Sequence, residues 1–113
     1  MRFEVVEVSP TVNKLVMVGR LDSATVGGVE APFTAAVAAE GKSAILDMRQ
    51  LEFLSSLGIR LLLSSARVVT RRGGKVVLFG AQPMVAEVLT AMALDAVLPH
   101  VATEPEAMAK IAA

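Results

Sequence analysis

Two adjacent serines, Ser55 and Ser56, stand where an apolar run ends and a helical pattern begins. The first N–H groups of a helix have no partners inside the helix, and the local field there favours negative charge. A serine at this place either caps the helix or offers a hydroxyl on which a phosphate would be stabilised. With Ser56 as the N-cap, Arg60 lies one turn further on, within reach of such a phosphate. The junction therefore predicts an exposed serine that a kinase could modify.

The other reactive residues lack the partners that an enzyme needs. Asp22 and Asp47 are expected at strand ends, where carboxylates either perform acid–base catalysis or simply cap a turn. Ser56, His100 and Asp47 supply the residue types of a hydrolytic triad, but the G-x-S-x-G pattern is absent. The glycine patterns of nucleotide-binding loops and the H-E-x-x-H metal motif are also absent. We expect no catalytic residue, metal or cofactor, and a small-molecule enzyme stays only as a third alternative.

The composition describes a neutral and apolar chain of one domain's length. The 113 residues include 11 basic and 11 acidic side chains, and 54% of them are hydrophobic. We therefore predict a single domain, residues 1–113, with no direct nucleic-acid partner and no membrane partner. No apolar run reaches the roughly 20 residues that span a bilayer, so a cytoplasmic location is expected. The basic residues Arg67, Arg71, Arg72 and Lys75 cluster at the end of a predicted helix, where cations complement the helix dipole.

Hydrophobic periodicity predicts alternating strands and helices after a leading β-hairpin. The predicted strands are 3–8, 14–19, 43–48, 75–79 and an edge strand within 96–101. The predicted helices are 25–40, one that follows Ser56 and runs to about residue 72, one that opens at 82–83, and a last one after Thr103. The order β-β-α-β-α-β-α-(β)-α predicts an α/β fold, with a mixed four- to five-stranded sheet flanked by about four helices. Met84, Met92 and Met108 stand at helical spacings and are predicted to fill the core.

Three stretches of the chain resemble one known family. Residues 19–25 read G-R-L-D-S-A-T, residues 45–59 contain I-L-D and then F-L-S-S-L-G-I, and residues 73–78 read G-G-K-V-V-L. Together they resemble the STAS domain of the anti-sigma-factor antagonist (anti-anti-sigma factor) type over nearly the whole chain. That family commonly shows G-x-L-D-x-x-T and D-L-x-x-V-x-F-[IM]-D-S-[ST]-G-[LI]. The family's aspartate before the acceptor serine is replaced here by Ser55, and Leu57 precedes the glycine.

The resemblance implies a STAS-like fold that does not itself catalyse a reaction. In the family, an anti-sigma factor that is also a serine kinase with an ATPase-type fold phosphorylates the acceptor serine. The unphosphorylated antagonist binds that kinase and releases the sigma factor, and a PP2C-type phosphatase restores it. Carried over by position, the phosphoacceptor is Ser56. The implied partner-binding residues are Asp22, Ser55, Ser56, Leu57, Gly58 and Arg60.

A second interpretation keeps the fold and drops the switch. The domain would then be a fixed STAS adaptor, for example the small cytoplasmic partner of the ATPase of a lipid ABC transporter. Neighbouring genes distinguish the two interpretations, and so does a Ser56→Asp variant that still binds its partner. The high apolar content leaves a homodimer open as well.

Overall fold

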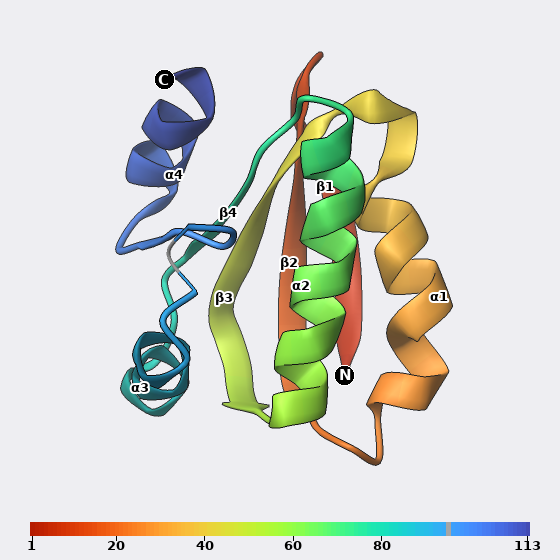
Figure 1. Ribbon diagram of the computed structural model, residues 1–113, viewed down its shortest axis with the longest axis vertical. Coiled ribbons are helices and arrows are strands. Elements are labelled where there is room, and N and C mark those ends of the chain that lie inside the picture. The colour runs from red at the N-terminus through yellow and green to blue at the C-terminus, as the bar shows by residue number, and fades with distance from the viewer. Residues whose placement is uncertain (95) are drawn as a thin grey trace.

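Strands and helices alternate after an initial β-hairpin, as Figure 1 shows. The computed structural model describes residues 1–94 and 96–113. The strands are β1 (Arg2–Ser9), β2 (Val12–Leu21), β3 (Ser43–Leu54), β4 (Val76–Phe79) and β5 (His100–Val101). The helices are α1 (Val26–Val37), α2 (Ser56–Arg71), α3 (Pro83–Ala91) and α4 (Glu104–Ala112), with a 3₁₀ turn at Ala39–Gly41.

The described residues form one five-stranded mixed sheet in the order β1-β2-β3-β4-β5. β1 pairs with β2 in the antiparallel sense, and each later pair of neighbours is parallel. Parallel neighbours need a crossover connection, and α1, α2 and α3 supply the three crossovers. The predicted α/β fold with a mixed sheet and four helices is therefore confirmed.

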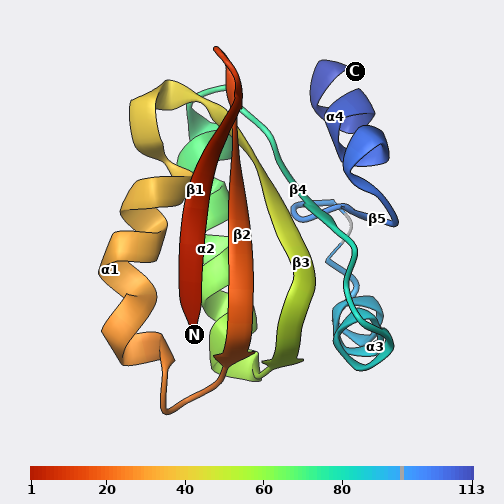
Figure 2. The ribbon, with the colours of Figure 1, turned by 180° about the vertical axis from the view of Figure 1, so that it is seen from behind.

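The helices divide between the two faces of the sheet. Crossovers between parallel strands are almost always right-handed, which places successive helices on the same face when the strands follow in order. Phe33 of α1, Leu62 of α2 and Leu89 of α3 accordingly share one core with β2 and β3. On the other face, Ala107 of α4 packs in a smaller cluster with Ile45 and residues of β4. Seen from behind in Figure 2, β1 and β2 have no helix in front of them.

The third strand is longer than the hydrophobic pattern predicts. It was expected to end at residue 48, but it continues to Leu54 because β2 stays paired with it beyond that point. The exposed residues Arg49 and Gln50 interrupt the apolar run without interrupting the backbone pairing. Asp47 is consequently an interior strand residue, and the expectation that it lies at a strand end is wrong.

Two further expectations are corrected near the C-terminal half of the chain. The edge strand predicted within 96–101 is reduced to His100–Val101, because Pro99 has no N–H to donate to β4. The carbonyl oxygen of Pro99 still accepts a hydrogen bond from Leu78 N–H at 2.8 Å. Met84 and Met92 are 60% and 49% exposed, so they do not fill the core as predicted.

Candidate functional site

The helix that follows the two serines begins one residue earlier than the sequence argument assumed. Ser55 is the N-cap of α2, with extended backbone angles of φ −92° and ψ 172°. Its Oγ accepts a hydrogen bond from Gly58 N–H at 3.2 Å, which satisfies one of the unpaired donors of the first turn. Ser56 is therefore the first helical residue, and its side chain does not cap the helix.

The Ser56 hydroxyl lies on the surface at the positive end of α2. Ser56 and Arg60 are both exposed, and no hydrogen bond of the Ser56 side chain occurs among residues 1–94 and 96–113. Leu57 beside it is 41% exposed, so part of an apolar side chain also lies on this surface. The first turn thus presents an accessible hydroxyl, an apolar side chain and a cation on one surface.

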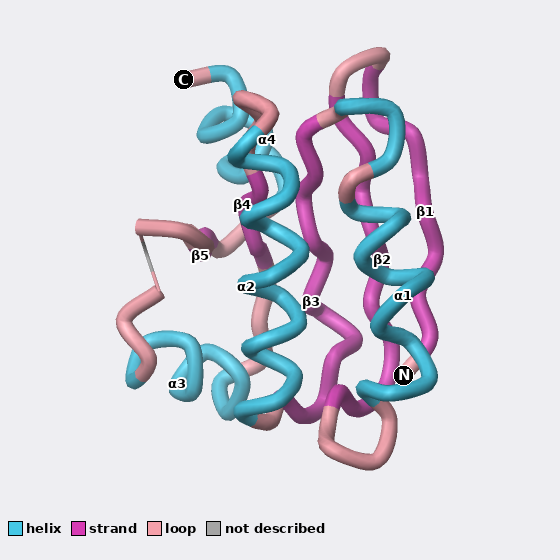
Figure 3. Tube along the Cα trace, turned by 45° about the vertical axis from the view of Figure 1, so that its right-hand side comes forward, coloured by secondary structure: helices cyan, strands magenta, loops and turns pink. Residues whose placement is uncertain are grey.

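A direct backbone contact fixes this turn against the end of β2. Ser55 N–H donates a hydrogen bond to the carbonyl oxygen of Leu21 at 2.9 Å. Gly58 is buried against the same residue, and a Cβ added to it would lie 2.8 Å from the Leu21 carbonyl oxygen. Only glycine lets α2 approach β2 so closely. In Figure 1 and Figure 3, β2 ends and α2 begins at the same end of the sheet.

Asp22 forms a turn beside this contact. Its Oδ1 accepts hydrogen bonds from the N–H groups of Ala24 at 3.0 Å and Thr25 at 3.2 Å. Partial desolvation opposes ionisation of this carboxyl, but these hydrogen bonds outweigh it and lower its pKa. Asp22 is therefore a negative charge near the first turn of α2, and of the two roles considered for it the hydrogen bonds show the turn cap.

Arg20 and Phe53 border the same surface, and the sequence argument did not identify either of them. The Arg20 guanidinium lies 4.4 Å from the centre of the Phe53 ring and 3.5 Å from Asp22 Oδ2. The two residues are register partners on β2 and β3. This long-range pairing has no signal in either local sequence, so only the structure brings them together.

Ser56, His100 and Asp47, the residue types of a hydrolytic triad, are not linked to one another by the hydrogen bonds that the structure shows among its described residues. Asp47 is 1% exposed, and its carboxylate accepts two hydrogen bonds from the Arg49 side chain at 2.7 and 3.0 Å. Burial alone would raise the pKa of Asp47, but the hydrogen bonds from Arg49 lower it overall. His100 Nε2 accepts a hydrogen bond from Ala81 N–H at 3.2 Å. Within the described part of the chain, Asp47 makes no hydrogen bond or ion pair with Ser56 or Asp22.

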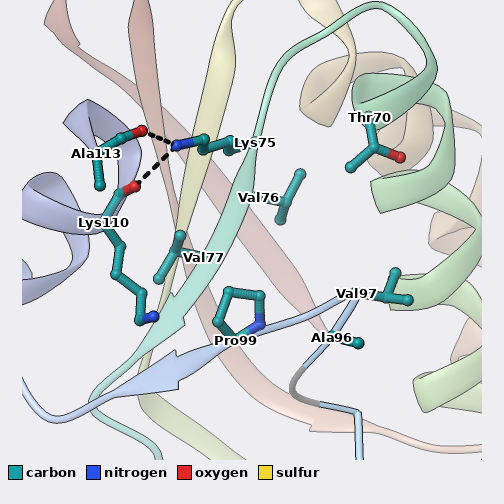
Figure 4. Close-up of a pocket in the computed structure, with 9 residues that line it drawn as sticks. All are labelled: Thr70, Lys75, Val76, Val77, Ala96, Val97, Pro99, Lys110 and Ala113. Atoms are coloured by element: carbon teal, nitrogen blue, oxygen red, sulfur yellow. Dashed lines mark hydrogen bonds between the residues drawn. The ribbon is translucent and has the colours of Figure 1, made fainter.

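A cavity of about 340 Å³ is lined by residues of β4, of α4 and of the segment before β5 (Figure 4), and neither Ser55 nor Ser56 is among its lining residues. Val76, Val77 and Pro99 form its apolar walls. Lys75 Nζ donates hydrogen bonds to the carbonyl oxygens of Lys110 and Ala113. Lys75 directly precedes β4, so these bonds connect the end of α4 to the start of that strand. The cavity thus belongs to the packing of α4 and brings no predicted site residue with it.

The described residues contain no cluster of three or more metal-ligating side chains of His, Cys, Asp or Glu. None of the helices in the described ranges is long and apolar enough to cross a membrane.

Comparison with known proteins identifies the family of this arrangement. The sequence matches the STAS domain family over residues 5–107, and the chain therefore belongs to that family. No curated protein sequence matches it.

Solved structures share the fold over almost the full chain. An anti-sigma-factor antagonist (STAS) domain protein from Planctomyces limnophilus is 25% identical, with a TM-score of 0.84 and coverage of 98% of both chains. The anti-sigma factor antagonist SpoIIAA in its unphosphorylated form is 23% identical, with a TM-score of 0.77 and coverage of 98% and 96%. The Bacillus cell fate determinant SpoIIAA in its phosphorylated form is 22% identical, with a TM-score of 0.69 and coverage of 97% and 99%.

Proposed function

We propose that this STAS domain is an anti-sigma-factor antagonist that acts by binding rather than by catalysis. In its unphosphorylated form it would bind an anti-sigma factor that is also a serine kinase with an ATPase-type fold, and so release the sigma factor. Phosphorylation of Ser56 would end this binding, and a PP2C-type phosphatase would restore it. Such a protein would act in the cytoplasm as a monomer or a homodimer.

The observation that supports this proposal is the exposed position of the Ser56 side chain at the start of α2. Its hydroxyl is exposed at the first position of α2 and is not used to hold the fold, because Ser55 caps the helix. A phosphate on Ser56 would meet N–H donors at the positive end of the helix and the cation of Arg60, so the folded domain tolerates it. Support also comes from a relative of the same fold, SpoIIAA, whose structure is known in a phosphorylated form.

The surroundings of Ser56 explain how one phosphate would control binding. Leu57 and the Asp22 turn lie on the same surface, so a partner that covers them also covers Ser56. Phosphorylation adds about −1.5 to −2 charges at that place. Removing those charges from water at an interface costs several kcal/mol, which corresponds to a loss of affinity of at least about 100-fold.

A competition experiment tests this function. Each anti-sigma factor kinase encoded in the source genome is purified as a complex with its sigma factor, and release of sigma on addition of this protein is measured. We expect release by the wild-type protein and by Ser9→Ala, a serine at the end of β1 that lies outside the α2 surface, and none by Ser56→Asp. Ser56→Asp that releases sigma as well as wild type would instead favour a non-switching adaptor, such as a subunit bound to a lipid ABC transporter ATPase.

A further inference from the structure

A shallow groove runs along the exposed side of α2, with Ser56 at one end. It measures about 410 Å³ and is lined by Ser56, Ile59, Arg60, Leu63, Ser64, Arg67 and Met92. Its floor is apolar, because Ile59 is buried and Leu63 is partly buried. Met92, the residue after α3, is 49% exposed, so half of its side chain is available to a partner. Methionine at such a place adapts to apolar side chains of different shapes.

Arginine side chains line this groove and continue beyond it toward the end of α2. Arg60, Arg67 and Arg71 follow one another at spacings of seven and four residues, which places all three on one side of α2. All three are exposed, whereas the sixteen residues of α2 include no Asp or Glu. No ion pair of these arginines occurs in the described ranges, although six ion pairs occur elsewhere in them. Among the residues that the structure describes, no ion pair therefore neutralises this positive stripe.

From this charge and shape we infer that the groove along α2 receives an acidic amphipathic segment of the partner. Carboxylates of that segment pair with Arg60 and Arg67, and an apolar side chain lies between them against Leu63 and Met92. Arg67 is then a specificity-determining residue, because it selects among kinases by the charge of their docking segment. The inference rests on the proposed function and adds to it the chemistry of the partner.

The same geometry relates the groove to the phosphorylation site. Ser56 and Arg60 are one turn apart, so a phosphate on Ser56 would occupy the Arg60 guanidinium that a partner carboxylate needs. Arg67 lies two turns further along and stays free. The inference therefore assigns the two arginines different roles: Arg60 belongs to the switch and to docking, whereas Arg67 belongs to docking alone.

Affinity measurements test the role of Arg67. Binding of each purified kinase is measured by titration calorimetry for wild type, Arg67→Gln, Arg67→Glu and the control Arg2→Glu, whose arginine is exposed on the edge strand β1. We expect affinity to fall about 10-fold for Arg67→Gln and about 100-fold for Arg67→Glu, and to change less than about 3-fold for Arg2→Glu. The control carries the same change of net charge as Arg67→Glu, so it separates a local pair from the overall field.

A chemical cross-link identifies the partner's group directly. A zero-length carbodiimide reagent joins lysine to a carboxylate in contact with it, so Arg67→Lys and the control Arg2→Lys are each cross-linked to the bound kinase and digested for mass spectrometry. A link from position 67 to an aspartate or glutamate of the kinase supports the inference. Unchanged affinity of Arg67→Glu, or links from position 2 but not from position 67, would overturn it and leave the proposed function standing. A wild-type protein that binds none of the kinases would remove both.

Discussion

A methyl group on Gly58 would lie 2.8 Å from the carbonyl oxygen of Leu21, so the absence of a side chain at Gly58 is what lets helix α2 rest on the end of strand β2. That same carbonyl oxygen accepts the hydrogen bond from Ser55 N–H. The two contacts hold Ser56 at a fixed position beside the Asp22 turn. The end of β2 and the first turn of α2 therefore form one continuous surface.

Replacing Gly58 with alanine tests this close approach. The added Cβ would meet Leu21 and Leu54 atoms at 2.8–2.9 Å, so α2 must move, and we expect a loss of about 1–3 kcal/mol in the free energy of unfolding. Urea denaturation measures it. The control is Gly28→Ala in α1, where nothing lies within 4 Å, and we expect a gain of about 0.5–1 kcal/mol there. Equal effects of the two substitutions would show that the approach at Gly58 is not tight.

The two serines are predicted to differ in their effect on stability. Ser55→Ala removes the acceptor of the Gly58 N–H bond and should cost about 1 kcal/mol in the free energy of unfolding. Ser56→Ala removes an exposed hydroxyl and should change stability by less than about 0.5 kcal/mol. Thermal and urea unfolding of both variants check this. The reverse order would mean that Ser56, and not Ser55, caps the helix.

A negative charge at position 56 is predicted to separate stability from binding. Ser56→Asp places a carboxylate in the first turn of α2, where the helix dipole should raise the free energy of unfolding by about 0.3–1 kcal/mol. Its binding to the kinase should nevertheless fall by at least about 100-fold. Calorimetric unfolding and calorimetric binding on the same sample give both quantities. If binding falls only together with stability, the loss reflects damage to the fold and not a switch.

Asp47 predicts an acid-sensitive contribution to stability. Its pKa in the folded protein lies below the ordinary value of 3.8, because hydrogen bonds from Arg49 outweigh the effect of burial. As the pH falls below about 4, the unfolded chain binds a proton at this residue before the folded chain does, so the free energy of unfolding decreases. The contribution is complete above that pH and disappears below the pKa of the folded state.

The variant Asp47→Asn checks the contribution of this ion pair. It should unfold about 1–3 kcal/mol more easily at pH 7, because it loses the charge that Arg49 pairs with. Its free energy of unfolding should also fall less steeply than that of wild type between pH 5 and pH 3. Identical slopes for the two proteins would show that another carboxyl group dominates the acid transition.

Much of the fold follows from local sequence because its signals are short-range. The Val-rich runs around Ser9-Pro10 predict the hairpin, and α2 ends just before Gly73-Gly74, where Gly73 has a positive φ of 83°. The length of β3 could not be predicted in the same way. Its polar residues Arg49 and Gln50 break the apolar pattern, and only pairing with β2 keeps the strand extended through them. Tertiary pairing here overrides a local signal.

The position of the site in the chain could be predicted, but which serine caps the helix and which side chains are exposed could not. The serine junction is visible in the sequence, yet two adjacent serines have equal tendencies to cap a helix. The choice of Ser55 depends on where β3 ends and on how Gly58 fits against Leu21. The exposure of Met92 could not be inferred either, because its helical spacing is the same as that of a core residue. Such details depend on contacts between segments far apart in the chain.

Mapping of the phosphate tests the central claim most directly. The protein is incubated with ATP and each anti-sigma factor kinase that binds it, and phosphopeptides are identified by mass spectrometry in wild type, Ser56→Ala and the control Ser9→Ala. We expect one phosphate, on Ser56, in wild type and Ser9→Ala, and none in Ser56→Ala. A Ser56→Ala protein that is still phosphorylated to the same extent, or a wild-type phosphate on another residue, would contradict it.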